Sequence, residues 1–194
     1  SVQHLNLKTD DIFGVDLKEI NFSAKQGEIL GIAGVAGNGQ SELLAALSGE
    51  TTLTESSVIM FPSSDITQCN PMQRRAQGMA FVPEDRLGHG AVPDMSLRDN
   101  ALLTGFLQGL TERGFLKNKT IENFTTSIIN KFDVKCSGHS SLAKSLSGGN
   151  LQKFIIGREV LQSPKCLIAA HPTWGVDIGA ATSIHKALIA LRDK

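Results

Sequence analysis

Apolar and polar residues alternate through the N-terminal part of the chain. The apolar positions in this part are Val2, Leu5, Leu7, Val15, Leu17, Ile20 and Phe22. A period of two residues is typical of half-buried strands, so the pattern predicts two short strands joined by the turn-rich residues 9–14. The continuous apolar run at residues 29–33 then predicts a buried strand.

The middle of the chain changes from a strand pattern to a helical one. Residues 49–80 are turn-rich and predict a β-hairpin around Val58 to Phe61 and a short helix near residues 71–77. Residues 79–82 predict a second buried strand. From residue 95 to residue 144, helical spacing dominates, and no strand pattern is seen. This block is interpreted as a helical insertion within an α/β domain.

Two helix starts in this second half have recognisable caps. Ser96 is followed three residues later by Asp99, as in a capping box. A Ser-Gly-Gly turn at Ser147 opens a predicted helix that runs to about Leu161, where Ser163 and Pro164 stop it. Residues 166–170 predict a strand, and residues 180–191 predict a final helix.

The richest stretch for chemistry is the glycine-rich turn after the predicted strand at 29–33. It leads into a predicted helix at residues 42–47 that ends near Gly49. Backbone N–H groups and a helix N-terminus would converge there on one phosphate. The spacing is that of G-x-x-x-x-G-K-[ST], with Gln40 at the lysine position and Ser41 offering a hydroxyl to Mg²⁺. The turn consists of Gly34, Val35, Ala36, Gly37, Asn38, Gly39, Gln40 and Ser41.

Other interpretations of these motifs stay open. A glycine-rich turn also serves as a plain connector. The dinucleotide pattern G-x-G-x-x-G, started at Gly37, puts Glu42 where the third glycine belongs, and a carboxylate there would repel pyrophosphate. Phe13 either stacks on a nucleotide base or anchors its loop in the core. Residues 130–133 spell N-K-x-D, but they close a helical pattern, whereas the guanine-binding motif follows a strand.

Composition excludes several classes of protein. The 194 residues are 41% hydrophobic and carry 19 basic and 19 acidic side chains, so no overall basic field attracts nucleic acid. No apolar run has the length of a membrane span, and no signal peptide opens the sequence. Cys69, Cys136 and Cys166 are widely spaced, which fits a reducing compartment better than a disulfide scaffold. The histidines form no ligand cluster.

Three segments together resemble the nucleotide-binding domain of ABC transporters. Residues 146–150, Leu-Ser-Gly-Gly-Asn, are similar to the family signature in the form typical of importers for simple sugars and nucleosides. Residues 172–180 are similar to the D-loop of that subfamily. Residues 83–86, with Gly88 and Gly90, are similar to the Q-loop of the second half of two-domain ATPases, where glutamate replaces the glutamine.

The resemblance implies a fold, cofactors and partners. The fold is an α/β, P-loop NTPase-like core with a mostly parallel sheet, an N-terminal antiparallel β segment and a helical subdomain. Residues 1–85 and 146–194 would form the ATP-binding core, and residues 86–145 the helical subdomain. The cofactors are ATP and Mg²⁺. The partners are a second nucleotide-binding domain, membrane permease subunits and, indirectly, a solute-binding protein, with no nucleic acid.

The resemblance also implies a peripheral location on the cytoplasmic face of the cell membrane, and it assigns site residues. Ser41 and Glu84 would bind the metal, and Glu84 and His171 hold catalytic positions. Nucleotide contacts are expected from the glycine-rich turn, from Glu42 and Phe13, and from Ser147, Gly148, Gly149, Asn150 and Asp177. The block from Glu84 to Lys144 is expected to carry the apolar patch that docks on the permease.

Several positions depart from the family pattern. Gln40 replaces the phosphate-loop lysine, and Ala170 and His171 replace the Asp-Glu pair expected before Pro172. These losses predict weak nucleotide binding and very slow hydrolysis at the chain's own loop, although His171 remains a possible base near pH 7. The signature is intact and would complete the site of a partner domain. The family carries a further strand and a switch histidine after this point, so a longer subunit is expected.

Two other functions remain open besides an importer subunit. One is a regulatory or structural domain that binds a partner and no nucleotide. The other is a DNA-linked ABC ATPase, against which the zero net charge and the lack of a coiled-coil insertion argue.

Overall fold

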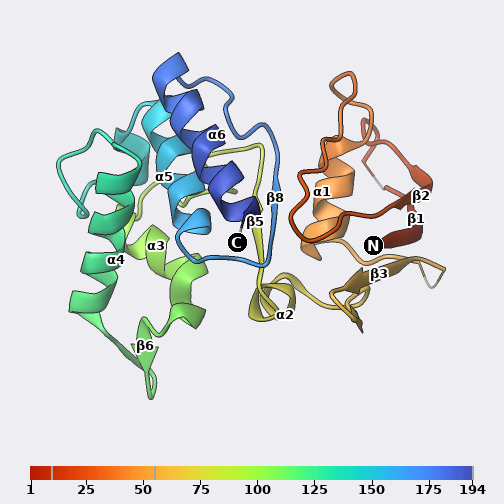
Figure 1. The fold of residues 1–194 in the computed structure, drawn as a ribbon, viewed down its shortest axis with the longest axis horizontal. Helices are drawn as coiled ribbons and strands as arrows, with labels where there is room; N and C mark the ends of the chain where they lie inside the picture. The colour runs from red at the N-terminus through yellow and green to blue at the C-terminus, as the bar shows by residue number, and fades with distance from the viewer. Residues whose placement is uncertain (10, 55, 194) are drawn as a thin grey trace. The chain divides into compact units, whose positions relative to one another are not determined.

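The computed structural model describes residues 1–9, 11–54 and 56–193. The chain forms two compact units, residues 1–79 and residues 80–193 (Figure 1). A hydrophobic cluster that includes Val82, Phe154 and Ile184 fills the second unit.

An antiparallel sheet organises the N-terminal unit. It contains β1 (Val2–Leu7), β2 (Leu17–Phe22), β3 (Val58–Phe61) and β4 (Ser64–Asp65), in the order β2-β1-β3-β4. All three neighbouring pairs are antiparallel. Leu5, Leu7 and Leu17 are buried, as the alternating pattern requires. The two predicted N-terminal strands and the predicted hairpin are therefore confirmed.

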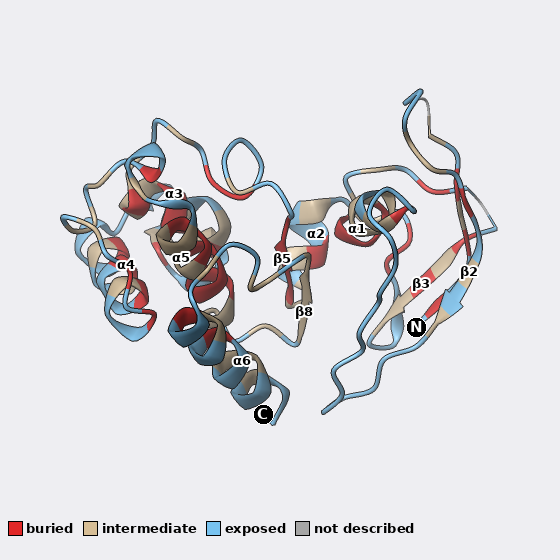
Figure 2. Cartoon of the chain, turned by 90° about the horizontal axis from the view of Figure 1, so that it is seen from above, coloured by how far each residue is buried: buried red, intermediate tan, exposed pale blue. Residues whose placement is uncertain are grey.

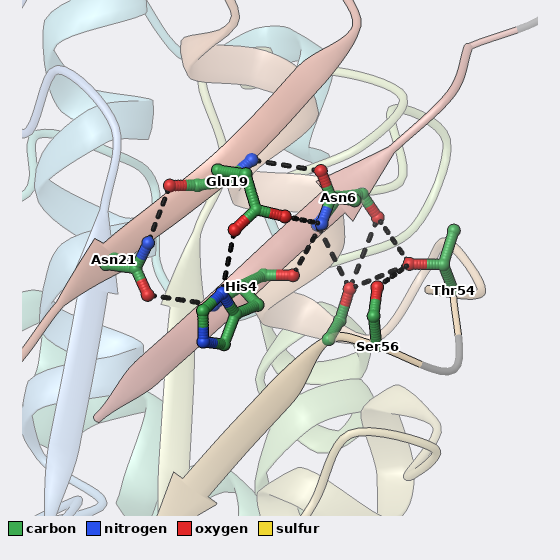
Figure 3. A network of polar contacts seen from close by, with 7 residues as sticks. His4, Asn6, Glu19, Asn21, Thr54 and Ser56 are labelled. Carbon is green, nitrogen blue, oxygen red and sulfur yellow. Dashed lines mark hydrogen bonds and ion pairs between the residues drawn. The ribbon is translucent and has the colours of Figure 1, made fainter.

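Polar side chains cross-link β1 and β2 where their pairing is irregular (Figure 3). His4 and Glu19 both have positive φ, 48° and 50°, which marks bulged backbone. The Nδ1 atom of His4 lies 2.7 Å from Oε2 of Glu19, and Asn6 donates to Oε1 of the same carboxylate at 2.8 Å. The hydrogen bonds from His4 and Asn6 lower the pKa of Glu19. The network compensates for ladder hydrogen bonds that the bulges interrupt.

Two helices complete the N-terminal unit. The first, α1 (Gln40–Ser48), follows the glycine-rich turn and ends at Gly49, as predicted. The second, α2 (Pro71–Ala76), starts with a capping box between Asn70 and Gln73 and confirms the predicted short helix.

A fully buried arginine joins these two helices. Arg74 in α2 donates to the carbonyl oxygens of Ala46 and Leu47, the last turn of α1, at 2.8 and 2.7 Å. Its Nε and second terminal nitrogen donate to the carbonyls of Cys69 and Thr67 at 2.8 and 2.9 Å. Burial lowers the pKa of Arg74. The guanidinium thus satisfies carbonyl groups that a helix C-terminus leaves unpaired.

The predicted buried strand at residues 29–33 is wrong. These residues adopt no regular secondary structure, and Ile29, Leu30 and Ile32 are exposed (the segment before α1 is pale blue in Figure 2). An apolar run forms a strand only where a neighbouring strand offers a hydrogen-bonding edge, and no such ladder includes residues 29–33 within the described ranges. The apolar pattern alone does not supply this partner.

The C-terminal unit is a helical assembly beside a two-stranded sheet. The sheet pairs β5 (Met79–Val82) with β8 (Cys166–Ala169). Both strands were predicted from the sequence and are confirmed. The central helix is α5 (Gly148–Val160), which contacts α3 (Leu97–Gly105), α4 (Asn118–Lys131) and α6 (Ile178–Arg192). Figure 2 shows α5 largely in red, because most of its residues are buried. The helix starts predicted at Ser96 and Ser147, the final helix predicted at residues 180–191 and the helical character of the middle block are therefore confirmed.

The middle block contains a hairpin that the sequence pattern did not predict. Strands β6 (Thr111–Glu112) and β7 (Phe115–Leu116) pair around Arg113 and Gly114, whose φ values are 50° and 85°. Two positive φ values in a two-residue loop are the hallmark of a tight hairpin turn. The expectation that this block has no strands is therefore wrong. Two 3-10 helices, η1 (Phe106–Gln108) and η2 (Ala143–Ser145), complete the unit.

A buried arginine ties α5 to α3 and to the segment before α3. Arg158 donates to Oε1 of the adjacent Glu159 at 2.8 Å and to the carbonyl oxygens of Asn100 and Gly90 at 3.2 and 2.9 Å. Both side chains are almost fully buried. Among the described residues, none of the helices has the length and apolar character needed to cross a bilayer.

Candidate functional site

The glycine-rich turn has the backbone conformation that its glycines allow. Gly37 and Gly39 have φ values of 82° and 97°, in a region where side chains are strained. A Cβ atom at Gly39 would lie 2.8 Å from Cδ2 of Leu17, so this position also requires a residue without a side chain. Gly39 is the N-cap of α1, and as a glycine it provides no side-chain cap for this helix.

The side chain of Gln40 folds back onto this turn. Its Nε2 donates to the carbonyl oxygen of Val35 at 3.0 Å, and its Oε1 accepts the N–H of Asn38 at 3.1 Å. A Cβ at Gly34 would lie 2.5 Å from Nε2, so the carboxamide packs against the start of the turn. Gln40 therefore occupies one of the N–H groups that a phosphate would need and adds no positive charge.

The first turn of α1 also positions the loop that carries Phe13. Oε1 of Glu42 accepts the N–H of Val15 at 3.0 Å, so Glu42 serves as a loop anchor. The Phe13 side chain is 92% exposed, and its N–H is held by the Asp11 carboxylate at 3.0 Å. The proposal that Phe13 is a buried anchor is therefore wrong, and base stacking stays a prediction. Ser41 is exposed at the start of α1.

The signature, residues 146–150, forms the start of α5 in the C-terminal unit. Ser147 is the N-cap of this helix, and both Ser147 and Gly148 are exposed. Gly149 lies against the D-loop, since a Cβ there would be 3.3 Å from the carbonyl oxygen of Gly175. The tip of the signature is thus open to a ligand or a partner surface.

Arg86 connects three segments around the signature. Its Nε donates to Oε1 of Gln152 in α5 at 3.0 Å, and a terminal nitrogen donates to the carbonyl oxygen of Trp174 in the D-loop. Cβ atoms at Gly148 and Gly175 would lie 2.6 and 3.0 Å from its terminal nitrogens. Arg86 itself belongs to the Q-loop segment, so one guanidinium fixes the Q-loop, the signature helix and the D-loop together.

Glu84 and His171, the two residues predicted at catalytic positions, lie side by side. Nε2 of His171 is 3.7 Å from Oε1 of Glu84, and both side chains are about half exposed. His171 has a φ of 44°, which is a strained conformation for a residue other than glycine. Its ring also meets Trp174 edge to face, with centroids 5.8 Å apart. Glu84 thus brings a carboxylate next to His171, beside the position where Ala170 replaces an expected aspartate.

The remaining predicted residues have structural partners. Asp177 caps α6 by accepting the N–H of Ala180 at 2.9 Å, and this hydrogen bond lowers its pKa. Ala170 donates its N–H to the carbonyl oxygen of Val82 at 2.9 Å, which continues the β5–β8 pairing.

Residues 130–133 close α4, and no strand precedes them there. In the described part of the chain, no three His, Cys, Asp or Glu side chains gather as metal ligands.

The predicted residues thus form two groups. One group surrounds the glycine-rich turn of the N-terminal unit, and the other, with Glu84, His171 and the signature, belongs to the C-terminal unit. Sequence reasoning placed Arg86 and Trp174 within motif segments but did not single out Arg86, Gln152 or Trp174 as residues of the second group. The spacing of these residues in the sequence gave no indication of their contacts, because the contacts depend on the packing of segments that are far apart in the sequence.

Comparisons with known proteins agree with the resemblance. The sequence model of the family described as "ABC transporter" matches residues 17–174. The nucleoside import ATP-binding protein NupA of Lactococcus lactis is 39% identical over 194 residues, which is all of this chain and 38% of that protein. The guanosine import ATP-binding protein NupO of Bacillus subtilis is 40% identical over 185 residues, 94% of this chain and 36% of that protein. The chain therefore spans well under half the length of these relatives.

The fold agrees as well. The ATP-binding cassette MJ0796, solved as a dimer in a post-hydrolysis state with ADP and Pi, superposes with a TM-score of 0.81 at 20% identity. The superposition covers 99% of this chain and 82% of that one. The predicted fold class, an α/β P-loop NTPase-like core, is thereby confirmed. Taken with the family match over residues 17–174, these similarities show that the chain belongs to the ABC transporter family.

Proposed function

We propose that this chain is a nucleotide-binding domain of an ABC importer for a simple sugar or a nucleoside. Its own phosphate loop binds ATP and Mg²⁺ weakly, through the turn around Gly37 and the hydroxyl of Ser41. Its signature completes the ATP site of a second cassette. Residues 1–85 and 146–194 belong to the ATP-binding core, and residues 86–145 form the helical subdomain. The names of the relatives, which are nucleoside, guanosine and ribose import ATP-binding proteins, support this class of transport.

One contrast carries the proposal. At the phosphate loop, Gln40 accepts an N–H of the turn and leaves the site without a cation, whereas the signature tip at Ser147 is intact and exposed. Charge-assisted hydrogen bonds are roughly twice as strong as neutral ones. Without a lysine, the phosphate loop therefore loses its strongest contact to ATP, whereas the signature keeps its contacts. The dimer of the cassette MJ0796 supports the pairing of two such domains. The domain then contributes more to the ATP site of its partner than to its own ATP site.

The helical subdomain offers a surface for the permease. Exposed apolar side chains occur on α3, η1 and the β6–β7 hairpin: Leu103, Leu107, Phe115 and Leu116. Phe115 is 79% exposed, and an exposed apolar group of this kind is typical of an interaction surface. Docking there would place the domain on the cytoplasmic face of the membrane as a peripheral subunit, with the solute-binding protein acting indirectly through the permease.

The substitution Ser147→Arg tests the role of the signature. In the assembled transporter, a long cationic side chain at the α5 N-cap removes the hydroxyl and blocks the approach of a partner cassette. We expect ATP hydrolysis to fall roughly 100-fold, as for the loss of a donor to a developing charge. Ser140→Arg, at another exposed serine of the same unit, is the matched control. Gln40→Ala should change the rate little, and the reverse order of the two effects contradicts the proposal.

The substitution Gln40→Lys tests the weakness of the chain's own loop. Lysine restores a cation and releases the N–H of Asn38, so ATP should bind about 10- to 100-fold more tightly in calorimetric titrations with Mg²⁺. Gln40→Met is the control, because it releases the same N–H without adding charge. Equal affinities in the lysine and methionine variants would show that the missing cation is not what weakens the site.

A further inference from the structure

The hydrogen bonds around the signature fix the direction in which the Ser147 hydroxyl can donate. Asn150 is the last residue of the signature. It lies in the first turn of α5 and is half-buried. Its Oδ1 accepts the backbone N–H of Lys135 at 2.9 Å. Because a backbone N–H can only donate, this contact decides which end of the Asn150 carboxamide is oxygen.

The other end of the carboxamide is therefore the amino group, and it points to Ser147. Nδ2 of Asn150 lies 2.9 Å from Oγ of Ser147, and the backbone N–H of Asn150 reaches the same oxygen at 3.5 Å. An NH₂ group cannot accept a proton, so the hydroxyl oxygen is the acceptor in both contacts. A serine hydroxyl has two acceptor positions and one proton. With both acceptor positions used, its proton is left to point away from α5.

The turn that supplies the Lys135 N–H is itself held on α5. Phe132 is buried against Gly157, where a Cβ would lie 2.6 Å from its ring. The N–H of Val134 donates to the carbonyl oxygen of Ile129 at 2.9 Å, and Nζ of Lys153 in α5 donates to the carbonyl oxygen of Asp133 at 3.2 Å. The residues that spell N-K-x-D thus start a turn after α4 that is hydrogen-bonded to α4 and α5, and this turn sets the orientation of Asn150.

We propose that Asn150 is a positioning residue that makes the Ser147 hydroxyl an obligatory donor toward a phosphate oxygen held by the partner cassette. This inference rests on the proposed function, in which the signature faces a partner's triphosphate. Asn150 acts through Ser147, and its own carboxamide is occupied by Lys135 and Ser147. The end of α4 thereby controls the donor geometry of the signature.

The hydrogen bonds can be tested without nucleotide by NMR of the ¹⁵N-labelled protein. Asn150→Leu keeps a similar volume but removes the acceptor for Lys135, so the Lys135 amide should exchange with solvent at least about tenfold faster. Asn150→Asp keeps an acceptor there, and protection of Lys135 should persist. Ser147→Ala should shift the Asn150 side-chain NH₂ resonances. An unchanged exchange rate in the leucine variant, or unchanged resonances in the alanine variant, overturns the inference.

The coupling to function is tested by a double-mutant cycle in the assembled transporter. Ser147→Ala alone should lower ATP turnover, and Asn150→Leu alone should lower it about tenfold. In the Ser147→Ala background, Asn150→Leu should cost less than about twofold, because residues acting through one another are not additive. Asn150→Asp should lower turnover at least as much as Asn150→Leu, because the carboxylate accepts a hydrogen bond from the Ser147 hydroxyl and turns it away from the phosphate. Thermal unfolding of each variant records any loss of folding.

Two results separate the possible failures. If Ser147→Ala lowers turnover but Asn150→Leu costs the same factor in both backgrounds, Asn150 does not act through Ser147, and this inference fails while the proposed function stands. If Ser147→Ala leaves turnover unchanged, both the proposed function and the inference are overturned.

Discussion

Replacing Arg74 by methionine is expected to destabilise the N-terminal unit by more than about 3 kcal/mol, because buried carbonyl groups left without a donor cost roughly 1–3 kcal/mol each. Arg74 is fully buried and serves four carbonyl oxygens, two of them in the last turn of α1. Methionine fills a similar volume and supplies no donor. The C-terminus of α1 would then have to open to water or fray.

Hydrogen exchange followed by mass spectrometry measures this effect for residues 40–79 separately from the rest of the chain. We expect faster exchange in α1 and α2 of the Arg74→Met variant. Arg75→Met is the matched control, since it removes the same charge from the neighbouring, half-buried position of the same helix. Equal exchange in the two variants would mean that the carbonyl contacts of Arg74 contribute little to stability.

Replacing Arg158 by methionine is expected to destabilise the C-terminal unit by about 3–5 kcal/mol, the usual cost of removing one partner of a buried ion pair. The guanidinium contacts Glu159 and the carbonyl oxygens of Asn100 and Gly90. The substitution leaves the Glu159 carboxylate in the core with one cation fewer. Chemical unfolding followed by the fluorescence of Trp174, the single tryptophan, reports on this unit.

A double substitution separates the charge effect from simple loss of packing. In Arg158→Met with Glu159→Leu, both charges are gone, and buried pairs replaced by apolar residues of similar size are often close to neutral. The double variant should therefore recover the part of the lost stability that comes from the Glu159 carboxylate, while the loss of the hydrogen bonds to Asn100 and Gly90 remains. Double and single variants with the same unfolding midpoint would show that the ion pair itself is not responsible.

The sequence predicted those elements whose signals are local. Helices α1, α3 and α5 begin or end at recognisable positions, namely Gly49, Ser96 and Ser147, and the structure places caps at all three. The prediction of a strand at residues 29–33 was wrong because a strand needs a partner strand, and the apolar pattern does not show whether one is present. The β6–β7 hairpin was missed because its strands have only two residues each, too few for a period to appear.

The candidate site was predictable in its motifs and not in its contacts. The substitution of Gln40 for lysine is visible in the sequence, but its hydrogen bonds to Val35 and Asn38 are not. In the same way, Arg74 and Arg75 are adjacent and chemically alike, and only the folded structure shows that Arg74 is buried. Such roles depend on which segments the fold brings together, and no periodicity records that choice.

Arg86 shows what this dependence means for the tolerance of the chain to mutation. Its guanidinium would crowd a methyl group at Gly148 or Gly175, two positions far from it and from each other in the sequence. A substitution at Gly148 would look like a lesion of the signature, although its steric cause lies in the Q-loop segment, whereas Gly175 is also restricted by its own φ of 58°. A lineage can accept a larger residue at Gly148 once the flexible end of the Arg86 side chain shifts, whereas a larger residue at Gly175 also needs a change of backbone conformation.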